Sequence, residues 1–189
     1  MRIGLFFGSF NPIHHGHLIL AQHFINETDM EQVWMVVSPQ NPFKPAAGML
    51  DEYQRLHLAH LALENNPRIK AVDIEFHLPR PSYTIDTLTY LAEKYPKNQF
   101  SLIMGGDSLQ NLAQWKNATQ IMQHYPVYVY KRPGFDVKNP GCKELIVVDA
   151  PLLEISATRI RELIKKRKPV RYLLPDAVIS EIERSGYYR

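Results

Sequence analysis

MRIGLFFGSFNPIHHGHLIL, residues 1–20, is the stretch that decides the fold class of this chain. Residues 2–7 form a short and nearly continuous apolar run, which is typical of a strand buried on both faces of a parallel sheet. The apolar positions of 15–26 then recur with the period of a helix. A buried strand that passes through a short loop with glycine and proline into a helix is the opening of a strand–helix–strand unit.

The rest of the chain repeats this alternation. Further strands are predicted over 32–38, 70–76, 100–106, 126–132 and 145–150. Helices are predicted over 51–65 and 84–95, in a stretch around Trp115, and at 158–166 and 175–185. We therefore expect a single α/β domain over 1–189, with a doubly wound, mostly parallel sheet and a small C-terminal helical part at about 156–189. In such sheets ligands bind beyond the carboxyl ends of the strands, which directs attention to the loops after residues 7, 38, 76, 106 and 132.

Composition excludes several classes of protein. Of the 189 residues 45% are hydrophobic, so the chain can fill a core and is not expected to be disordered. Its net charge of +3 is too small to indicate nucleic-acid binding. No apolar run reaches the about 18 residues of a membrane span, and the single cysteine, Cys142, cannot form an internal disulfide. We expect a soluble cytoplasmic protein with no membrane or nucleic-acid partner. The sequence does not decide between a monomer and a homo-oligomer.

Three histidines, His14, His15 and His17, stand close together after the first strand. No cysteine cluster or H-E-x-x-H pattern completes a metal site around them, so we expect no protein metal ligand. A solvated polar turn is the plain alternative, and His15 is assigned to it. Gly8 and Gly16 allow a ligand close to the backbone, and the dipole of the following helix directs its positive end to the same place. Imidazoles there can bind phosphate, although the chain has neither a Walker loop nor a G-x-G-x-x-G pattern.

Residues 8–17 resemble the signature G-x-F-x-P-x-H-x-G-H of the nucleotidyltransferase superfamily that shares its H-x-G-H element with class I aminoacyl-tRNA synthetases. The resemblance implies a Rossmann-like nucleotidyltransferase fold. It also implies that His14 and His17 bind ATP phosphates and stabilise the pentavalent transition state, together with Arg161. The ATP site that it implies comprises Gly8, Ser9, Phe10, His14, Gly16, His17, Gly105, Asp107, Ile155, Ser156, Thr158 and Arg161.

The superfamily has a second phosphate-binding element of the form I-S-S-T-x-I-R, and this chain has ISATRIR at 155–161. Ser156 and Thr158 stand where a helix begins, so their hydroxyls and the backbone N–H groups can cradle phosphate. Arg161 supplies a positive charge for the triphosphate. For Ser156 alone an ordinary helix cap is the alternative. Ala157 departs from the pattern and removes one hydroxyl.

Three more segments narrow the resemblance to the bacterial nicotinate-nucleotide adenylyltransferases, namely PSYTIDTL (81–88), MGGDSLQNLAQWK (104–116) and YKRPG (130–134). That family joins nicotinate mononucleotide to the AMP part of ATP in NAD biosynthesis, forming deamido-NAD and pyrophosphate. The resemblance extends over nearly the whole chain. The acceptor site that it implies comprises Lys44, Ser82, Tyr83, Thr84, Asp107, Trp115 and Arg132.

Several acceptor residues also have a physical interpretation. Thr84 stands at a predicted helix start, where N–H groups can receive the nicotinate carboxylate, and it is expected to cap that helix. Trp115 offers a face for stacking a pyridine ring, although a place in the core is the alternative. Asp107 is expected to accept hydrogen bonds from ribose hydroxyls. Lys44 and Arg132 bring positive charge to the mononucleotide phosphate.

The expected chemistry is a direct in-line attack of the acceptor phosphate on the α-phosphorus of ATP, with Mg²⁺ entering together with ATP. Two positions depart from the family pattern: Phe43 stands where histidine is common, and Asn11 where many members have aspartate. The nearest alternative is an adenylyltransferase for nicotinamide mononucleotide or phosphopantetheine. An alternative of another class is a non-catalytic nucleotide sensor or a basic nucleic-acid-binding module.

Overall fold

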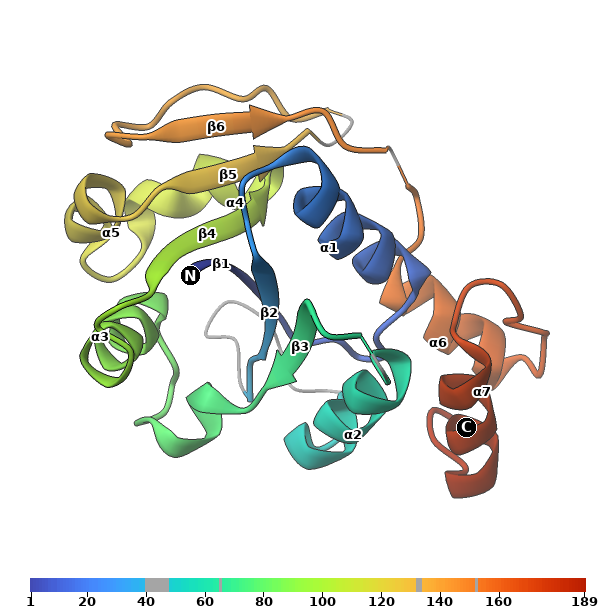
Figure 1. The fold of residues 1–189 in the computed structure, drawn as a ribbon. Helices are drawn as coiled ribbons and strands as arrows, with labels where there is room; N and C mark the ends of the chain where they lie inside the picture. The colour runs from blue at the N-terminus through green and yellow to red at the C-terminus, as the bar shows by residue number, and fades with distance from the viewer. Residues whose placement is uncertain (40–47, 65, 132–133, 152) are drawn as a thin grey trace.

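The computed structural model describes residues 1–39, 48–64, 66–131, 134–151 and 153–189. Within these residues one sheet of six parallel strands is formed. The strands are β1 (Arg2–Gly8), β2 (Gln32–Val37), β3 (Ile69–Val72), β4 (Gln99–Gly105), β5 (Val127–Tyr130) and β6 (Leu145–Val148). Their order across the sheet is β3-β2-β1-β4-β5-β6 (Figure 1). This is the order of a Rossmann-like doubly wound sheet, so the predicted fold class is confirmed.

Helices cover both faces of the sheet (Figure 1). One buried apolar cluster is shared by α1 (His15–Glu27), α2 (Glu52–Ala62), α6 (Ala157–Lys165) and α7 (Asp176–Ser185). A second cluster, on the opposite face, is shared by α3 (Thr84–Lys94), α4 (Gly106–Asn111) and α5 (Ala118–His124). Neighbouring residues of β1 alternate between the two, since Leu5 belongs to the second cluster and Phe6 to the first. The strands are buried on both sides, which explains their continuous apolar runs.

The C-terminal helices are packed onto the same core as the first strand. Ile160 of α6 and Ile182 of α7 belong to the cluster that contains Phe6 of β1. α7 also lies beside α2. The predicted C-terminal helical part therefore reaches back to the sheet face that carries α1.

One predicted strand is partly wrong. The strand predicted over 70–76 stops at the end of β3, and Ile74–His77 form a 3₁₀ helix. The N–H of Phe76 donates to the carbonyl of Asp73 at 2.8 Å, and the turn places Glu75 in the interior. Apolar alternation alone does not distinguish a short extended segment from such a tight turn, because both can bury every second side chain.

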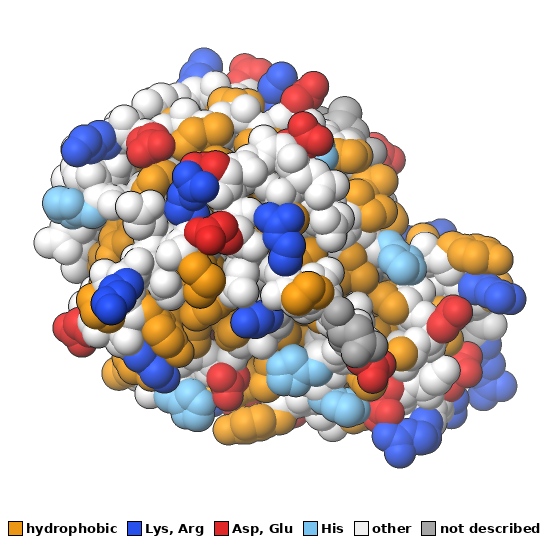
Figure 2. All heavy atoms as spheres, viewed as in Figure 1, with side chains coloured by type: hydrophobic (Ala, Val, Ile, Leu, Met, Phe, Trp, Pro, Cys, Tyr) orange, Lys and Arg blue, Asp and Glu red, His pale blue; other side chains and the backbone are white. Residues whose placement is uncertain are grey.

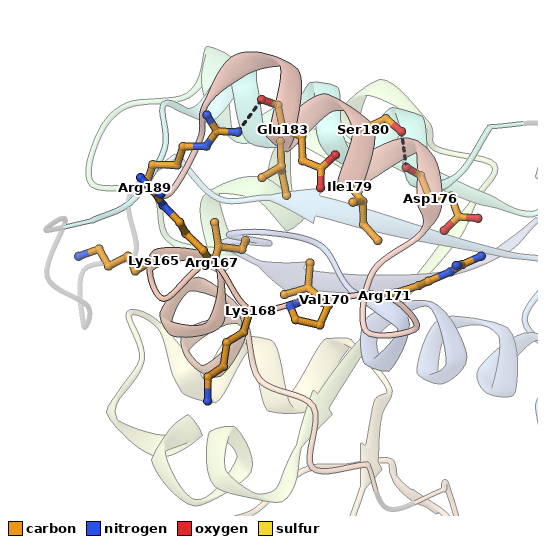
Figure 3. A pocket seen from close by; sticks show the side chains of 13 residues that line it. Lys165, Arg167, Lys168, Val170, Arg171, Asp176, Ile179, Ser180, Glu183 and Arg189 are labelled. Carbon is orange, nitrogen blue, oxygen red and sulfur yellow. Dashed lines mark hydrogen bonds between the residues drawn. The ribbon is translucent and has the colours of Figure 1, made fainter.

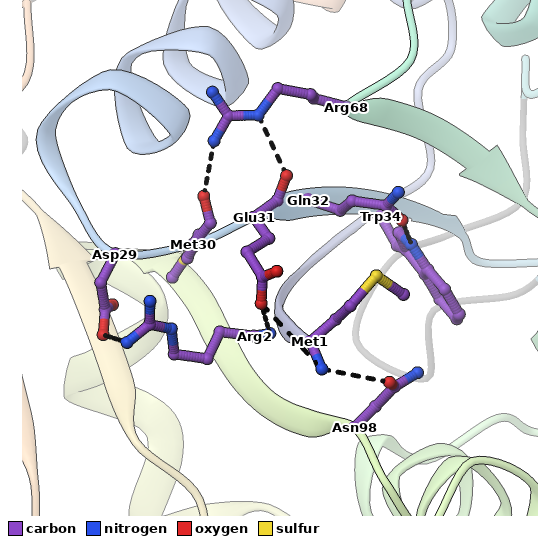
Figure 4. Close-up of polar contacts among 9 residues, drawn as sticks. All are labelled: Met1, Arg2, Asp29, Met30, Glu31, Gln32, Trp34, Arg68 and Asn98. Carbon is purple, nitrogen blue, oxygen red and sulfur yellow. Dashed lines mark hydrogen bonds and ion pairs between the residues drawn. The ribbon is translucent and has the colours of Figure 1, made fainter.

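Polar side chains tie together the amino-terminal edge of the sheet, opposite the edge where such folds bind ligands (Figure 4). Arg68 donates to the backbone carbonyls of Met30 and Glu31 at 2.9 and 3.0 Å. Arg2 pairs with Asp29 at 2.9 Å, and both side chains are about half exposed. Exposed ion pairs of this kind contribute at most about 1 kcal/mol each, so we assign this edge a structural role.

The surface carries mixed charge on the face shown in Figure 2. Lys and Arg side chains lie interspersed with Asp and Glu over the sheet and its helices. Several more Lys and Arg side chains lie along the border of the lower-right part, which is formed by α6 and α7. No helix in the described ranges combines the length and the apolar character that crossing a membrane requires.

Candidate active site

Two histidines stand at the start of α1, beyond the carboxyl end of β1. His14 is the capping residue of α1 and is 5% exposed, and His17 lies in the first turn. The backbone N–H of His14 donates to Nδ1 of His17 at 3.3 Å, and the two rings stack with their centroids 3.6 Å apart. A neutral imidazole that accepts at Nδ1 carries its proton on Nε2, where it can donate to a phosphate oxygen. The structure thus brings the two predicted phosphate ligands into contact.

Phe10 packs beneath the surface of the loop between β1 and α1. Its ring is buried and stands nearly perpendicular to that of His17, with centroids 5.0 Å apart. The same ring fills the space beside Gly8, where an added Cβ would come within 2.8 Å of it. The φ of Phe10 is 45°, in the left-handed region that side-chain-bearing residues rarely adopt. Phe10 and Gly8 therefore shape the loop, and the ring of Phe10 orients His17.

The two predicted phosphate elements meet at Gly16. An added Cβ there would lie 3.0 Å from Nδ1 of His14 and 3.4 Å from Cβ of Ile155. A side chain at this position would press on His14 and on the ISATRIR segment, so glycine favours the close approach of the first turn of α1 to that segment. Arg161 of that segment donates from Nη1 to the backbone carbonyl of Asn11 at 2.8 Å. Segments from the two ends of the chain are thus joined at one edge of the sheet.

The hydroxyls of the second element stand at the beginning of α6. Ser156 caps the helix, and its Oγ accepts from the N–H of Arg159 at 3.2 Å. The side chain of Thr158 is exposed and accepts from Nη2 of Arg161 at 3.2 Å. The capping role considered for Ser156 is therefore real. It is compatible with phosphate binding, because an accepting hydroxyl still has its own proton to donate.

The acceptor segments lie next to each other. α3 begins at Thr84, but the capping position is Tyr83, which makes no side-chain capping bond, so the expectation that Thr84 caps the helix is wrong. Nζ of Lys116 lies 2.9 Å from Oδ2 of Asp86 and 4.7 Å from the centre of the Tyr83 ring. The neighbouring Trp115 is half-buried and packs against the same apolar cluster as Tyr83. The two predicted acceptor segments thus meet at the start of α3.

Of four further predicted site residues, two lie in the segment after β4, and two lie outside the described residues. Gly105 ends β4, the strand that lies beside β1 in the sheet, and Asp107 lies in the first turn of α4. Lys44 and Arg132, together with Phe43, lie outside the described residues. The segments after β1, β3, β4 and β6 therefore supply the described part of the predicted site.

Comparison with known proteins decides the family. The chain matches the Cytidylyltransferase-like family over residues 5–163. A protein of Cytophaga hutchinsonii named "Probable nicotinate-nucleotide adenylyltransferase" is 52% identical, over 100% of this chain and 98% of that protein. The nicotinate-nucleotide adenylyltransferase of Bacillus subtilis is 34% identical, over 99% of this chain and 98% of its own. This chain belongs to the nicotinate-nucleotide adenylyltransferase family.

The nicotinate-nucleotide adenylyltransferase fold is also found among solved structures. The Plasmodium falciparum nicotinic acid mononucleotide adenylyltransferase complexed with NaAD superposes with a TM-score of 0.82 at 18% identity, covering 99% of this chain and 97% of that one. At this identity the likeness concerns the fold. Family membership makes this chain a nucleotidyltransferase.

A buried arginine organises this member of the nicotinate-nucleotide adenylyltransferases, and the sequence patterns do not reveal it. Arg55 of α2 is 0% exposed, and its guanidinium donates to the carbonyls of Ser9, Ser38, Pro39 and Leu50 at 2.6 to 3.0 Å. Burial lowers the pKa of Arg55. The loops after β1 and β2 and the start of α2 are thereby joined. An arginine on an amphipathic helix is normally expected in solvent, so only its tertiary contacts reveal this role.

A buried glutamate, Glu75, contacts the first turn of α3, and the sequence patterns do not reveal it either. Glu75 is 2% exposed, and its Oε1 accepts from the hydroxyl of Thr87 at 3.0 Å. Burial raises the pKa of Glu75, while the hydroxyls of Ser38, Thr87 and Ser82 act in the opposite direction. Ser82, one of the predicted acceptor residues, is itself buried. Glu75 therefore links the end of β2 to the acceptor segment.

A cavity of about 940 Å³ between α6 and α7 contains none of the predicted residues (Figure 3). Cations edge it, including Lys165, Arg167, Lys168 and Arg171. Figure 3 shows them projecting from the end of α6 and from the following loop. Lys165 lies in the last turn of α6, where the helix dipole favours positive charge, and the other three are exposed cations of a surface loop, so these side chains need no ligand to explain them.

Proposed function

We propose that this chain transfers the AMP part of MgATP to nicotinate mononucleotide, forming deamido-NAD and pyrophosphate in NAD biosynthesis. The observation that carries the proposal is the meeting of the two phosphate elements, with Gly16 against Ile155 and Arg161 bonded to the carbonyl of Asn11. The start of α3 lies at the same sheet edge and offers a place for an anionic acceptor. The names of the relatives refer to the same acceptor.

His14 and His17 hold the α- and β-phosphates in this proposal. Their position at the start of α1 supports it, because backbone N–H groups and the helix dipole favour an anion there. Ser156, Thr158 and Arg161 bind the leaving pyrophosphate and stabilise the negative charge that develops on it. Mg²⁺ comes with ATP as part of the substrate, held by phosphate oxygens and water, and we assign it no protein ligand.

The nicotinate half is assigned to the start of α3 and to the segment around Trp115. N–H groups near Ser82, Tyr83 and Thr84 receive the carboxylate, and the absence of a capping side chain from Tyr83 supports this assignment. The indole of Trp115 stacks on the pyridine ring. Asp107 accepts from ribose hydroxyls. Lys44 and Arg132 are proposed for the mononucleotide phosphate on the sequence pattern alone.

The reaction needs positioning and charge stabilisation rather than a strong base. The acceptor phosphate is already an anion at neutral pH, and its oxygen forms a bond to the α-phosphorus of ATP. The bond from that phosphorus to the oxygen bridging to the β-phosphate breaks, and its electron pair leaves on pyrophosphate. Protonated or donating imidazoles and a guanidinium stabilise the charge that develops. No covalent enzyme intermediate forms, so the buried thiol of Cys142, whose pKa is raised by burial, takes no part.

Pyrophosphate release tests this function. The purified chain is incubated with MgATP and, in separate reactions, with nicotinate mononucleotide, nicotinamide mononucleotide or phosphopantetheine. We expect release with nicotinate mononucleotide at a kcat/KM at least tenfold above that for the other two. Release only with another acceptor would refute the assignment of substrate, and no release with any acceptor would refute the activity.

Three wider proposals accompany the activity. The residues 1–189 act as one domain, which the shared cluster of Phe6, Ile160 and Ile182 supports. The chain works in the reducing environment of the cytoplasm, consistent with one buried cysteine. It takes no nucleic acid as partner, given its net charge of +3. Light scattering of the purified chain distinguishes a monomer from a homo-oligomer.

A further inference from the structure

The second-to-last residue of the chain reaches the active-site loop. The hydroxyl of Tyr188 donates to Oδ1 of Asn11 at 2.7 Å, across 177 positions of sequence. Asn11 lies three residues before His14, within the loop that carries the histidines. No motif discussed above includes Tyr188, and the proposed chemistry does not use it.

Asn11 joins the loop to three other segments. It is 6% exposed, and its Oδ1 also accepts from the N–H of Leu50 at 3.2 Å. Its Nδ2 donates to the carbonyl of Gly48 at 3.3 Å. Its backbone carbonyl accepts from Arg161 at 2.8 Å. The side chain of Asn11 therefore sets the loop relative to the start of α2, and its backbone does so relative to α6.

The backbone of the tail, residues 186–189, places Tyr188 beside Asn11. α7 ends at Ser185, and Gly186, which caps it, has a left-handed φ of 68°. The N–H of Tyr187 donates to the carbonyl of Ile182 at 3.1 Å. Tyr188 itself has a φ of 64°, a conformation that is unfavourable for a side-chain-bearing residue. The contact with Asn11 is therefore formed in spite of local backbone preference.

The burial of the phenol is consistent with a donor role. Burial raises the pKa of Tyr188 well above its usual range, although the cations Arg161 and Arg55 act in the opposite direction. The phenol thus keeps its proton. Arg161 and Arg55 are the two guanidiniums that hold the same loop, through Asn11 and Ser9 respectively.

We propose that Tyr188 is a positioning residue for the ATP site. Its hydroxyl holds Asn11, and Asn11 in turn keeps His14 and Arg161 in the arrangement that the transferring phosphate requires. The proposal rests on the proposed function. A small displacement of such groups lowers the rate, because the geometry of nucleotidyl transfer is set before the reaction begins. A purely structural role for the tail would lower stability but would leave the kinetics of the folded enzyme unchanged.

Tyr188→Phe removes only the hydroxyl, and Tyr187→Phe is the matched control on the adjacent ring. One neutral hydrogen bond lost from a positioning network corresponds to about a five- to tenfold effect. We expect Tyr188→Phe to lower kcat/KM for ATP about five- to tenfold, with KM for nicotinate mononucleotide within twofold of wild type. Tyr187→Phe is expected to leave both within twofold. Equal kinetics for Tyr188→Phe and wild type, or equal losses in the two variants, would overturn the proposal.

A double-mutant cycle with Asn11 tests the route of the effect. In the background of Asn11→Ala, Tyr188→Phe is expected to cause no further loss, because its partner is already gone. If Asn11→Ala does not fold, Asn11→Asp serves instead, since a carboxylate keeps the acceptor and the Tyr188→Phe loss should persist in full. Losses that multiply independently in the alanine background, or that vanish in the aspartate background, would contradict the proposed route.

The outcomes separate this proposal from the function beneath it. If wild type releases no pyrophosphate with any acceptor, the proposed function fails. Calorimetric affinity for a non-hydrolysable ATP analogue then tests the positioning of the ATP site, with about a fivefold weaker affinity expected for Tyr188→Phe. If wild type is active and Tyr188→Phe matches it in rate and in affinity, only the positioning proposal fails.

Discussion

His14 and His17 are joined through Nδ1 of His17, which accepts the backbone N–H of His14 at 3.3 Å. A neutral imidazole that accepts at Nδ1 carries its proton on Nε2, where it can donate to a phosphate oxygen. We expect His17→Ala to lower kcat about 10²- to 10³-fold, the usual cost of removing one donor that stabilises the transition state. His15→Ala is the control and should stay within about twofold of wild type. Steady-state pyrophosphate release measures both, and near wild-type turnover by His17→Ala would remove the histidine from the mechanism.

Gly16→Ala tests the closeness of the two phosphate elements. The added Cβ would lie 3.0 Å from Nδ1 of His14 and 3.4 Å from Cβ of Ile155, so the ring or the segment must shift. We expect kcat/KM for ATP to fall about tenfold or more, while stability holds, because alanine favours a helix over glycine by up to about 1 kcal/mol. Kinetics and thermal unfolding are measured together. Gln22→Ala, on an exposed part of the same helix, is the control, and unchanged kinetics of Gly16→Ala would contradict the interpretation.

Arg55→Lys tests the buried guanidinium. A lysine ammonium cannot reach carbonyls on several sides at once, so buried acceptors lose their donor. We expect the free energy of unfolding to fall by about 3 kcal/mol, measured by urea denaturation. Arg159→Lys, at an exposed position, should change it by less than about 0.5 kcal/mol. Equal stability of the two variants would show that the contacts of Arg55 contribute nothing specific.

Glu75→Gln tests the buried carboxyl through its pH dependence. A carboxyl whose folded-state pKa is raised contributes stability at low pH that is lost as the pH rises through that pKa. The variant has no such titration, so its Tm relative to wild type should increase as the pH rises above 4.5, the usual value. Thermal unfolding from pH 4 to pH 8 measures the difference. Exposed Glu93→Gln should give a nearly constant difference, and a constant difference for Glu75→Gln would refute the prediction.

Trp115→Ala tests stacking on the acceptor ring. Trp115 is half-buried, so one part of the indole packs against the core and another remains available. We expect KM for nicotinate mononucleotide to rise about tenfold and KM for ATP to stay within twofold, since aromatic pairs contribute about 1 kcal/mol beyond their buried area. Trp115→Phe should recover most of the loss. A rise in both KM values, or in neither, would assign the indole to the core alone.

Local pattern was enough to predict the element order and most element boundaries. The continuous run over 2–7 and the helical period over 15–26 report how each segment is buried, and burial follows directly from residue type and spacing. The same holds for the start of α6 at the ISATRIR segment, where Ser156 caps the helix. The 3₁₀ helix at Ile74–His77 was missed, because its pattern of burial resembles that of a strand.

Sequence by itself determined the fold class and the family, and it located the two motifs that we propose bind phosphate, because these depend on residues close together in the chain. Only the tertiary structure decided which motifs meet: Gly16 against Ile155, and Tyr188 against Asn11. It also decided that Arg55 and Glu75 are buried among hydroxyls and carbonyls rather than exposed. The physical reason is that hydrophobic periodicity records how much of a residue is buried. The partner that satisfies a buried polar group comes from wherever the fold brings the chain back.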